Sequence, residues 1–309
     1  MGLVRLVMLL ALAMAACGGS DAATTTAGDP VSIYAGPDGV TSTVTDVSRI
    51  VSVSGDFSEM VWALGLGENL VGVDLSSVYP KEEMRVLPKV GVEFRLLAEP
   101  ILALEPTLVI GDLDASPPEV IAQVRGAGVP VVLFPRYSGL DAPAEKIRAV
   151  AEVLGVPTEG DRLASEVQAE IDAAVALAAT ATSRPRVAVV YVASRDTVLL
   201  LGENTVFEGV IAALGAEDVG PPAGADGFVP LTPEAMVAAA PDVIITAERG
   251  FEQRGGLEGF LQLPGIAQTP AGQSGRVLVY EDLLLLGMGP RTGVLADLLV
   301  RALHPEIEG

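Results

Sequence analysis

Few residues in this chain could perform covalent chemistry. Among 309 residues there is one histidine, His304, and one cysteine, Cys17. His304 lies near the C-terminus, where we expect a frayed and solvated side chain, so no Ser or Cys nucleophile has a histidine base. The glycine-rich segment GLGEN (65–69) lacks the Lys and the Ser or Thr of a phosphate-binding loop. These features disfavour an enzyme.

Carboxylates are abundant, but no motif pairs them. Asp and Glu number 40 against 19 Lys and Arg, and the formal net charge is −21. Nothing in the sequence brings two carboxylates together as a glycosidase-like acid pair. A field of this sign repels nucleic acid phosphates and anionic lipid headgroups, so neither is an expected partner. A single terminal histidine also argues against a zinc or manganese binding protein.

The first 17 residues have the layout of an export signal followed by a lipid attachment site. Arg5 precedes an apolar run from Leu6, and Ala15 and Ala16 lead into Cys17. The run is shorter than the roughly 20 residues that span a bilayer. The segment resembles the lipobox of bacterial lipoproteins, which implies acylation of Cys17. We therefore expect an exported chain, held at the outer face of the cell membrane by its lipid alone.

Residues 18–45 differ in composition from the rest of the chain. They are rich in Gly, Ser, Thr, Ala and Asp and contain few large apolar side chains. Such a segment buries too little surface to offset the entropy of ordering, so we expect a flexible tether. Because Cys17 is the only cysteine, no disulfide framework can form.

Beyond the tether, short aliphatic runs alternate with helical patterns, which is typical of parallel sheets built from βαβ units. The predicted strands are 50–53, 70–73, 107–110, 129–134, 187–192, 243–246 and 277–280, and the predicted helices are 57–66, 118–126, 142–154, 161–181, 205–214 and 292 onward. We assign an N-terminal α/β lobe to 46–139, a helical connector to 140–183 and a C-terminal α/β lobe to 184–309. The predicted fold is α/β, with two doubly wound lobes joined by a long helix.

An internal repeat relates the two lobes. Residues 96–110 (LLAEPILALEPTLVI) align without gaps on residues 231–245 (LTPEAMVAAAPDVII). Each copy predicts a short helix with a glutamate in its first turn, Glu99 or Glu234, stopped by a proline before a buried strand. The helix dipole favours a carboxylate there. The two glutamates either stabilise the helix starts or contact a partner.

Several longer segments carry a family resemblance. They read RIVSVSGDFSEMVWALGLGENLVGVD (49–74), VYP and LPKVG within 78–91, and the two repeat elements. Together they resemble the substrate-binding proteins of ABC importers for iron complexes and cobalamin, which implies the helical-backbone periplasmic-binding-protein fold. The stretches GGLEGFLQLPGIAQTPAGQSGRV (255–277) and LLLLGMGPRTG (283–293) are similar, more narrowly, to haem-binding lipoproteins.

The resemblance also implies partners. In this family one glutamate of each lobe docks against arginines of the permease, and by motif these fall on Glu99 and Glu234. The expected partners are therefore a membrane permease with its ATPase and a transported ligand. No catalytic cofactor is expected.

Haem-binding relatives imply iron ligands at two positions where this chain has none. A Tyr or His usually follows the Val-Gly of the first-lobe motif, and here Val92 follows Val90 and Gly91. A Tyr is also frequent in the second-lobe strand motif, at the position of Leu199. Valine and leucine offer no donor atom to iron. If haem is the ligand, other residues must bind its iron.

Tyrosine and methionine can bind haem iron, and arginine can bind carboxylates bidentately. The candidates are Tyr79, Tyr137, Tyr191 and Met288 for iron, with Tyr79 of the SSVYP motif favoured as axial ligand, and Arg95, Arg195 and Arg291 for carboxylates. Each side chain has an alternative role in ordinary packing or in a surface ion pair.

The sequence therefore predicts an extracytoplasmic substrate-binding protein that captures haem and delivers it to a permease. A ferric siderophore or a corrinoid is the alternative ligand, because an anionic siderophore held by arginines needs no protein ligand on its metal. We expect a modest closure of the lobes, limited by the helix that joins them.

Overall fold

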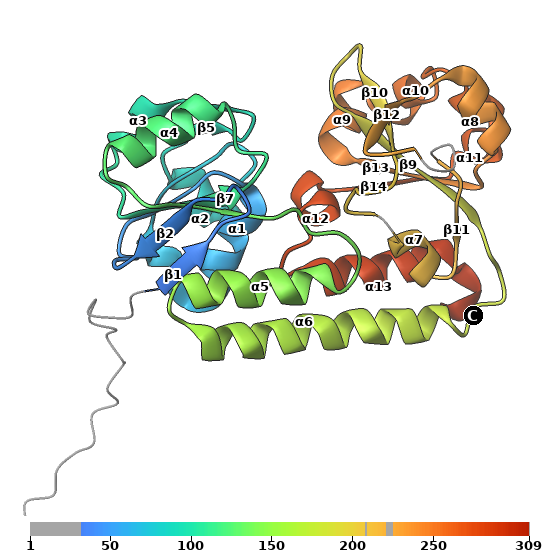
Figure 1. The fold of residues 1–309 in the computed structure, drawn as a ribbon. Helices are drawn as coiled ribbons and strands as arrows, with labels where there is room; N and C mark the ends of the chain where they lie inside the picture. Colours follow the sequence, from blue (N-terminus) through green and yellow to red (C-terminus); the bar gives the residue numbers. More distant parts are fainter. Residues whose placement is uncertain (1–31, 208, 221–224, 309) are drawn as a thin grey trace, which may run out of the picture.

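Two β-sheets lie at opposite ends of the molecule and are bridged along one side by a long helix (Figure 1). The computed structural model describes residues 32–207, 209–220 and 225–308. The predicted export signal, the lipid site at Cys17 and the first half of the predicted tether (18–31) lie outside these residues. The predicted α/β class with two lobes and a joining helix is confirmed.

The first sheet is entirely parallel. Its strand order is β4 (Leu70–Val73), β3 (Ile50–Ser52), β7 (Leu108–Asp112) and β8 (Val131–Phe134). Ile50 and Val51 belong to apolar clusters on opposite faces of this sheet. One face is covered by α1 (Gly55–Val61) and α5 (Ala142–Val153), and the other by α3 (Ala98–Leu102) and α4 (Pro118–Gly126). The sheet is doubly wound, as predicted.

The second sheet is mixed. Its order is β12 (Phe228–Pro230), β10 (Val198–Leu201), β9 (Arg186–Val192), β13 (Val243–Ala247) and β14 (Val277–Tyr280), with β11 (Glu217–Asp218) beside β9. Strands β10 and β12 run antiparallel to their neighbours, so the prediction of purely parallel sheets is wrong here. The five residues 193–197 join β9 to β10. A connection this short can only return the chain antiparallel.

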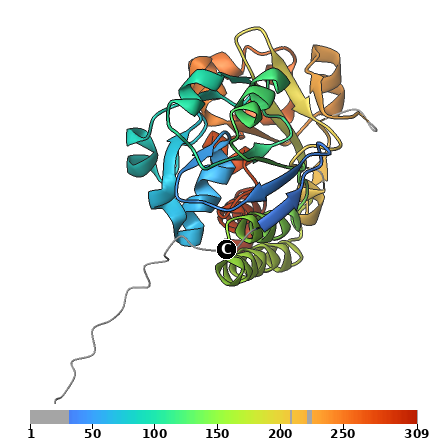
Figure 2. The same ribbon diagram turned by 60° about the vertical axis from the view of Figure 1, so that its left-hand side comes forward.

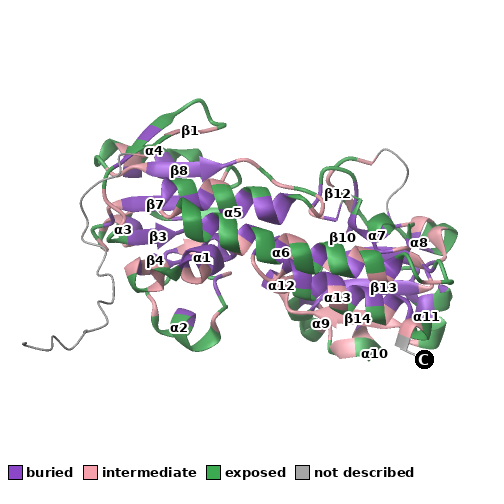
Figure 3. Ribbon diagram, turned by 90° about the horizontal axis from the view of Figure 1, so that it is seen from below, coloured by how far each residue is buried: buried purple, intermediate pink, exposed green. Residues whose placement is uncertain are grey.

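Helices cover both faces of this second sheet. One face packs against α7 (Val210–Ala213) and α13 (Thr292–Leu303), and the other against α8 (Pro233–Ala239), α9 (Glu248–Gln253), α10 (Gly256–Phe260) and α11 (Pro270–Ser274). Helix α7 is shorter than the predicted 205–214, because Gly209 lies just before it with a φ of 71°. Seen from below, strands β8 and β13 of the two sheets are buried, and the outer faces of the connecting helices are exposed (Figure 3).

Helix α6 (Pro157–Ala178) belongs to both cores. Its side chains Ala164, Val167 and Ile171 pack in the first-lobe core, and Ala174 and Ala178 pack in the second. It lies against α5 at one end and α13 at the other (Figure 1). A Cβ on Gly160 would overlap Ala151 of α5, and a Cβ on Gly293 of α13 would overlap Glu170, so glycine is required at both close approaches.

The prediction of a flexible tether over 18–45 is wrong for its last part. Strands β1 (Ser32–Ala35) and β2 (Thr41–Val44) form an antiparallel hairpin. It lies beside α5 on the first lobe (Figure 2). Tyr34 packs against Phe134 with ring centroids 4.9 Å apart, and Val44 is buried. Packing of Tyr34 and Val44 therefore orders a segment that its composition alone predicts to be unstructured.

Candidate functional site

Polar residues gather at the carboxyl edge of the first-lobe sheet. Ser52 ends β3, Asp56 begins the helix that follows it, Asp74 follows β4 and Asp112 ends β7. Ligands of open α/β sheets bind outside this edge. The backbone of Gly287 in the second lobe lies against Asp56. The edge therefore faces the other lobe, where α12 (Asp282–Leu286) sits between the two sheets (Figure 1).

A buried lysine joins this edge to both neighbouring parts of the chain. Lys146 of α5 donates a short hydrogen bond to the carboxylate of Asp56. Its Nζ is also 3.5 Å from the carbonyl oxygen of Gly287 and 4.6 Å from the ring centroid of Phe57. Lysine is rarely buried unless it is paired. This contact links the connector, the first lobe and the second lobe at one point.

A second ion pair crosses between the lobes one helical turn further along α1. Arg291, in the loop before α13, donates from Nε and Nη2 to the two carboxylate oxygens of Glu59 at 3.0 and 2.9 Å. Glu281 accepts from the same Nη2 at 3.3 Å and also caps α12 through the amides of Leu283 and Leu284. Burial raises the pKa of Glu59, and the hydrogen bond from Arg291 opposes that shift.

Tyr79 lies directly against this ion pair. The guanidinium carbon of Arg291 is 3.9 Å from the centroid of the Tyr79 ring. At this distance the cation and the ring face attract each other. Tyr79 is 43 % exposed, so part of the residue remains accessible to solvent. The structure thus brings together two candidates that are 212 positions apart in the sequence (291 minus 79).

The acidic residues of this edge are protected from solvent. Burial raises the pKa of Asp74 and of Asp112, and the Asp56 carboxylate adds to both shifts. Burial and the hydrogen-bonded Asp112 raise the pKa of Glu93 to about 10. Glu93 is therefore protonated at neutral pH and can donate to Asp112. Within the described part of the chain, no group of His, Cys, Asp and Glu side chains is arranged to hold a metal ion.

Two candidates lie opposite the positions that lack the expected iron ligands. Arg95 in β6 (Arg95–Leu96) pairs with Val92 in β5 (Gly91–Val92), and its side chain is exposed. Tyr191 in β9 pairs with Leu199 in β10, and its ring centroid is 6.0 Å from that of Phe228. Directly paired residues of neighbouring strands project from the same face. Arg95 therefore projects from the same sheet face as Val92, and Tyr191 from the same sheet face as Leu199.

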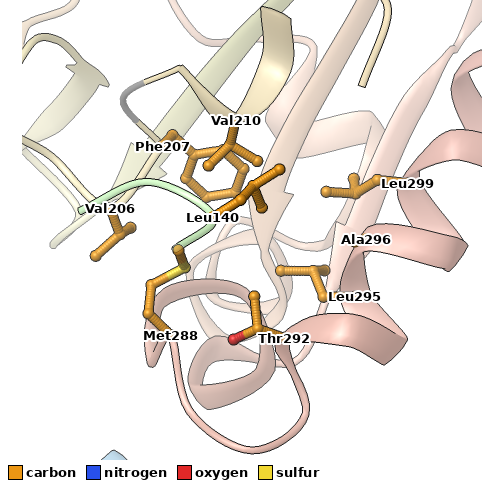
Figure 4. Close-up of a pocket in the computed structure, with 9 residues that line it drawn as sticks. All are labelled: Leu140, Val206, Phe207, Val210, Met288, Thr292, Leu295, Ala296 and Leu299. Atoms are coloured by element: carbon orange, nitrogen blue, oxygen red, sulfur yellow. The ribbon is translucent and has the colours of Figure 1, made fainter. Parts of the chain in front are cut away.

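Met288 does not have the environment predicted for a ligand-binding residue. Its side chain is buried and lines an apolar cavity of about 10 Å³ with Leu140, Phe207 and Leu295 (Figure 4). That cavity has room for no more than about one water molecule. We therefore assign Met288 to core packing, where its flexible thioether fills an irregular space.

Tyr137 and Arg195 lie in different surroundings. Tyr137 packs against the first-lobe core, with its ring centroid 5.8 Å from the Nζ of Lys146, and burial raises its pKa to about 12. Arg195 is exposed in the β9–β10 loop, and its carbonyl oxygen accepts a hydrogen bond from Arg254. Core packing accounts for the position of the Tyr137 side chain, whereas the side chain of Arg195 is exposed to solvent.

The two glutamates of the internal repeat lie at the outer ends of the lobes. Glu99 is in the first turn of α3 and Glu234 in the first turn of α8, and both are exposed. Helices α3 and α8 both lie on the side of the molecule remote from α6 (Figure 1). The repeat also preserves the core, because Ile101 and Met236 occupy equivalent positions and are fully buried.

Sequence reasoning missed the residues that join the lobes. Asp56, Glu59 and Lys146 are all buried and none was a candidate. One signal was available: Asp56 and Glu59 stand three residues apart in an otherwise apolar helical run, GDFSEMV. Charged residues in such a run need buried partners. Their partners, however, are remote in sequence and could not be identified.

Comparison with known proteins places the chain in a family. The family model described as periplasmic binding protein matches residues 50–283. The chain belongs to the periplasmic binding protein family. The resemblance proposed from the sequence segments is thereby confirmed.

Curated relatives of this periplasmic binding protein include transport lipoproteins. It is 25% identical over 319 aligned positions to YvrC of Bacillus subtilis, described as an ABC transporter substrate-binding lipoprotein, and the match covers 99% of this chain and 97% of YvrC. It is also 25% identical to a vitamin B12-binding protein of Vibrio parahaemolyticus, over 68% of this chain and 74% of the relative. Within the described ranges, no helix is long and apolar enough to cross a membrane.

Solved structures of similar periplasmic binding proteins carry haem in their names. The haem-binding protein RhuT of Roseiflexus sp. RS-1, in its apo form, is 47% identical with a TM-score of 0.81, and the match covers 85% of this chain and all (100%) of RhuT. The haem-binding protein HutB of Vibrio cholerae is 29% identical with a TM-score of 0.73, over 84% of this chain and 99% of HutB.

Proposed function

We propose that this chain is the substrate-binding protein of an ABC importer and that it captures haem at the junction between its lobes. The observation that carries the proposal is the contact between Tyr79 and Arg291, which come from different lobes and meet beside the carboxyl edge of the first-lobe sheet. A tyrosine oxygen can bind ferric haem iron. The chain is 47% identical to the haem-binding protein RhuT, and the match covers 85% of this chain and 100% of RhuT, which supports the same ligand.

Tyr191 is the proposed second-lobe contact. It projects from the same sheet face as Leu199, so a phenol is available from the neighbouring strand. Burial raises its pKa, and the nearby Asp282 carboxylate adds to the shift. Asp282 is the first residue of α12, and its influence on the pKa of Tyr191 supports a position of Tyr191 near the junction. A neutral phenol at this position can donate a hydrogen bond or face the porphyrin ring.

The haem propionates need cationic partners. Arg291 already donates to Glu59 and Glu281, which leaves its Nη1 group to interact with a ligand. Arg95 and Arg195 are exposed, one on each lobe. We assign propionate binding to Arg95 and Arg195, and we assign to Arg291 the orientation of Tyr79.

A corrinoid is the second candidate ligand. A relative named as a vitamin B12-binding protein, from Vibrio parahaemolyticus, matches the chain at 25% identity over 68% of its length. The residues Val92 and Leu199 also remove two expected iron ligands. A ferric siderophore remains the third ligand to test, because it would need the arginines but no protein ligand on iron.

Delivery and location follow the same proposal. Glu99 and Glu234 dock the loaded protein to the permease, and lipidation of Cys17 holds it at the outer face of the membrane. The name of the Bacillus subtilis relative supports a lipoprotein. We assign no catalytic activity, because a periplasmic binding protein acts by binding and release.

The test is an absorbance titration with hemin of the chain that begins at residue 18. A saturable shift of the Soret band is expected. Tyr79→Phe removes only the phenol oxygen, so we expect loss of the phenolate-to-iron charge-transfer band and at least tenfold weaker hemin binding. Tyr137→Phe is the matched control, because that tyrosine packs against the core, and it should bind hemin as the unmodified chain does.

Titrations of the same protein distinguish haem from the two alternative ligands. Cyanocobalamin and a ferric siderophore are titrated in parallel by following tryptophan fluorescence, since the chain has one tryptophan, Trp62. A response to either of these with no hemin response would overturn the haem proposal. Hemin binding that Tyr79→Phe leaves unchanged would overturn the role of Tyr79 alone.

A further inference from the structure

The single histidine of the chain is fully buried. His304 has 0% relative exposure, although the sequence predicts a frayed and solvated side chain at this position. It is the C-terminal capping residue of α13, and a short helix (Pro305–Glu308) continues the chain after it. A buried imidazole must have partners for both ring nitrogens. Those partners define a site far from the junction between the lobes.

Two short contacts reach the imidazole, and two more join Ser183 to Glu306. Its Nε2 is 2.8 Å from the carbonyl oxygen of Leu214, and its Nδ1 is 2.9 Å from the Oγ of Ser183. The Oγ of Ser183 is in turn 2.6 Å from Oε1 of Glu306, and the Ser183 backbone amide donates to the same oxygen at 3.0 Å. Ser183 lies in the loop between α6 and β9, so the chain of contacts joins three segments.

The number of protons in this chain of contacts determines the charge of the imidazole. A carbonyl oxygen only accepts, so Nε2 must carry a hydrogen to bind Leu214. The Glu306 carboxylate also only accepts, so the Ser183 hydroxyl proton points toward Glu306. The Ser183 oxygen then has no proton left for Nδ1, and Nδ1 must donate to it. Both ring nitrogens therefore carry hydrogens, and the ring is an imidazolium.

The same three contacts could form with the proton on Glu306 and a neutral ring. The surroundings of Glu306 exclude that arrangement. Its carboxylate is at the protein surface, and hydrogen bonds from the Ser183 hydroxyl and from backbone amides lower its pKa to about 2. Glu306 is therefore ionised at neutral pH. Its Oε1 is 3.8 Å from Nδ1, close enough to stabilise a positive ring.

The C-terminal ends of three helices also stabilise a positive charge on the imidazole ring. Leu214 is the C-terminal cap of α7, His304 itself caps α13, and the carbonyl of Ala178 at the end of α6 lies beside Gly215, next to the ring. The C-terminal end of a helix favours a cation. The opposing charges nearby are Arg276, which donates to the carbonyls of Ala302 and Leu303, and the exposed Arg184.

We propose that Ser183, His304 and Glu306 form a hydrogen-bonded clamp that pins the C-terminus to the exit of the connector helix, with hydrogens on both ring nitrogens of His304. The clamp does not depend on the haem proposal. When the ring loses its proton, one hydroxyl hydrogen must serve two acceptors, so one short contact is lost. The group is not a hydrolytic triad, because the carboxylate binds the serine and an imidazolium cannot act as a base.

Nitrogen NMR with ¹⁵N-labelled histidine tests the clamp directly, because the chain has one histidine and so one pair of ring signals. The chain is purified from residue 18 onward without a histidine tag. At pH 7.5 an ordinary histidine, whose pKa is about 6.5, is mostly neutral. We expect instead two protonated ring nitrogens. A neutral ring with only Nε2 protonated would overturn the proposal.

Variants show whether the named partners hold the proton. Glu306→Gln keeps the size of the side chain and removes its charge, and Ser183→Ala removes the bridging hydroxyl; both should leave a neutral ring at pH 7.5. The control is Glu159→Gln, an exposed glutamate at the far end of α6. The melting temperature of the unmodified chain should exceed that of Glu306→Gln. An unchanged imidazolium in both partner variants would overturn the clamp.

Discussion

At the scale of single residues, the first-lobe edge combines burial with an excess of carboxyl groups. Asp74, Glu93 and Asp112 all have raised pKa values, with burial as the largest cause. One oxygen of Glu93, Oε1, is buried without a hydrogen-bond partner. Groups of this kind lower the stability of the fold and persist where a site requires them. They lie beside the proposed haem contacts.

Glu93→Gln is expected to stabilise the protein at neutral and alkaline pH. In the unfolded chain Glu93 ionises near its ordinary pKa of 4.5, whereas in the fold it stays protonated up to about pH 10. The folded form therefore holds the extra proton, and stability falls as the pH rises between these values. Glutamine removes this loss. We expect a gain of about 2 kcal/mol at pH 8 and almost none at pH 4.

Urea denaturation at the two pH values measures this difference. Glu119→Gln is the control, since Glu119 is an exposed residue in the first turn of α4. It should change the free energy of unfolding by less than about 0.5 kcal/mol at either pH. A Glu93→Gln variant with the same stability difference at pH 4 and pH 8 would contradict the raised pKa.

At the scale of elements, the β1–β2 hairpin protects the edge of the first-lobe sheet. Strand β8 is the last strand of that sheet. The hydroxyl of Ser42 and the guanidinium of Arg125 both donate to the carbonyl oxygen of Val131 in β8, and Arg125 also pairs with Asp38 of the hairpin turn at 2.7 Å. Unpaired edge strands promote association with other chains. The hairpin satisfies part of this edge.

Tyr34→Ala should loosen the hairpin. The Tyr34 ring packs on Phe134, so its removal costs about 2 kcal/mol in the free energy of unfolding and exposes β8. Ile33 lies next to it on the opposite face and is 69 % exposed. Ile33→Ala is therefore the matched control and should cost less than about 0.5 kcal/mol. Equal effects of the two variants in chemical denaturation would contradict the packing role of the hairpin.

At the scale of the whole molecule, two features fix the lobes relative to each other. Helix α6 contributes side chains to both cores. At the junction, Arg291 pairs with Glu59 across the lobes, and Lys146, which pairs with Asp56, also reaches the carbonyl oxygen of Gly287 in the second lobe. A helix shared by both cores and an ion pair between the lobes oppose a wide hinge motion. We therefore expect only a small closure when ligand binds.

Arg291→Met should destabilise the ligand-free protein by about 3 kcal/mol, because it leaves Glu59 buried without its partner. The double variant Glu59→Gln and Arg291→Met removes both charges and should recover more than half of that loss. Chemical denaturation measures the stabilities, and small-angle X-ray scattering measures the spread of lobe positions. Equal stability of the single and double variants would contradict a coupled pair.

The proposed docking to the permease also concerns the whole molecule, because it uses one glutamate from each lobe. Glu99→Ala combined with Glu234→Ala should abolish ligand uptake by cells and leave the affinity of the purified protein unchanged. The matched control replaces Glu119 and Glu248, which are exposed in the first turns of α4 and α9. Uptake that survives the Glu99 and Glu234 changes would contradict the docking role of these residues.

Local patterns were sufficient for most elements of the fold. Strand β4 and helix α4 have the predicted bounds, and the predicted helix over 142–154 differs from α5 by one residue. These segments have a clear period or a clear start and stop, such as Pro118 at the first turn of α4. The hairpin and the direction of β10 were missed because strand pairing depends on the partner strand.

The sequence by itself determined the class of the protein. The repeat around Glu99 and Glu234, the aliphatic strands and the family segments all depend on neighbouring residues, so they can be recognised in the linear chain. Only the tertiary structure decided which charges meet. Glu59 and Arg291 are 232 positions apart, and His304 is 121 positions from Ser183. No local pattern encodes such pairs, because a buried charge constrains the chemistry of its partner but not its position in the sequence.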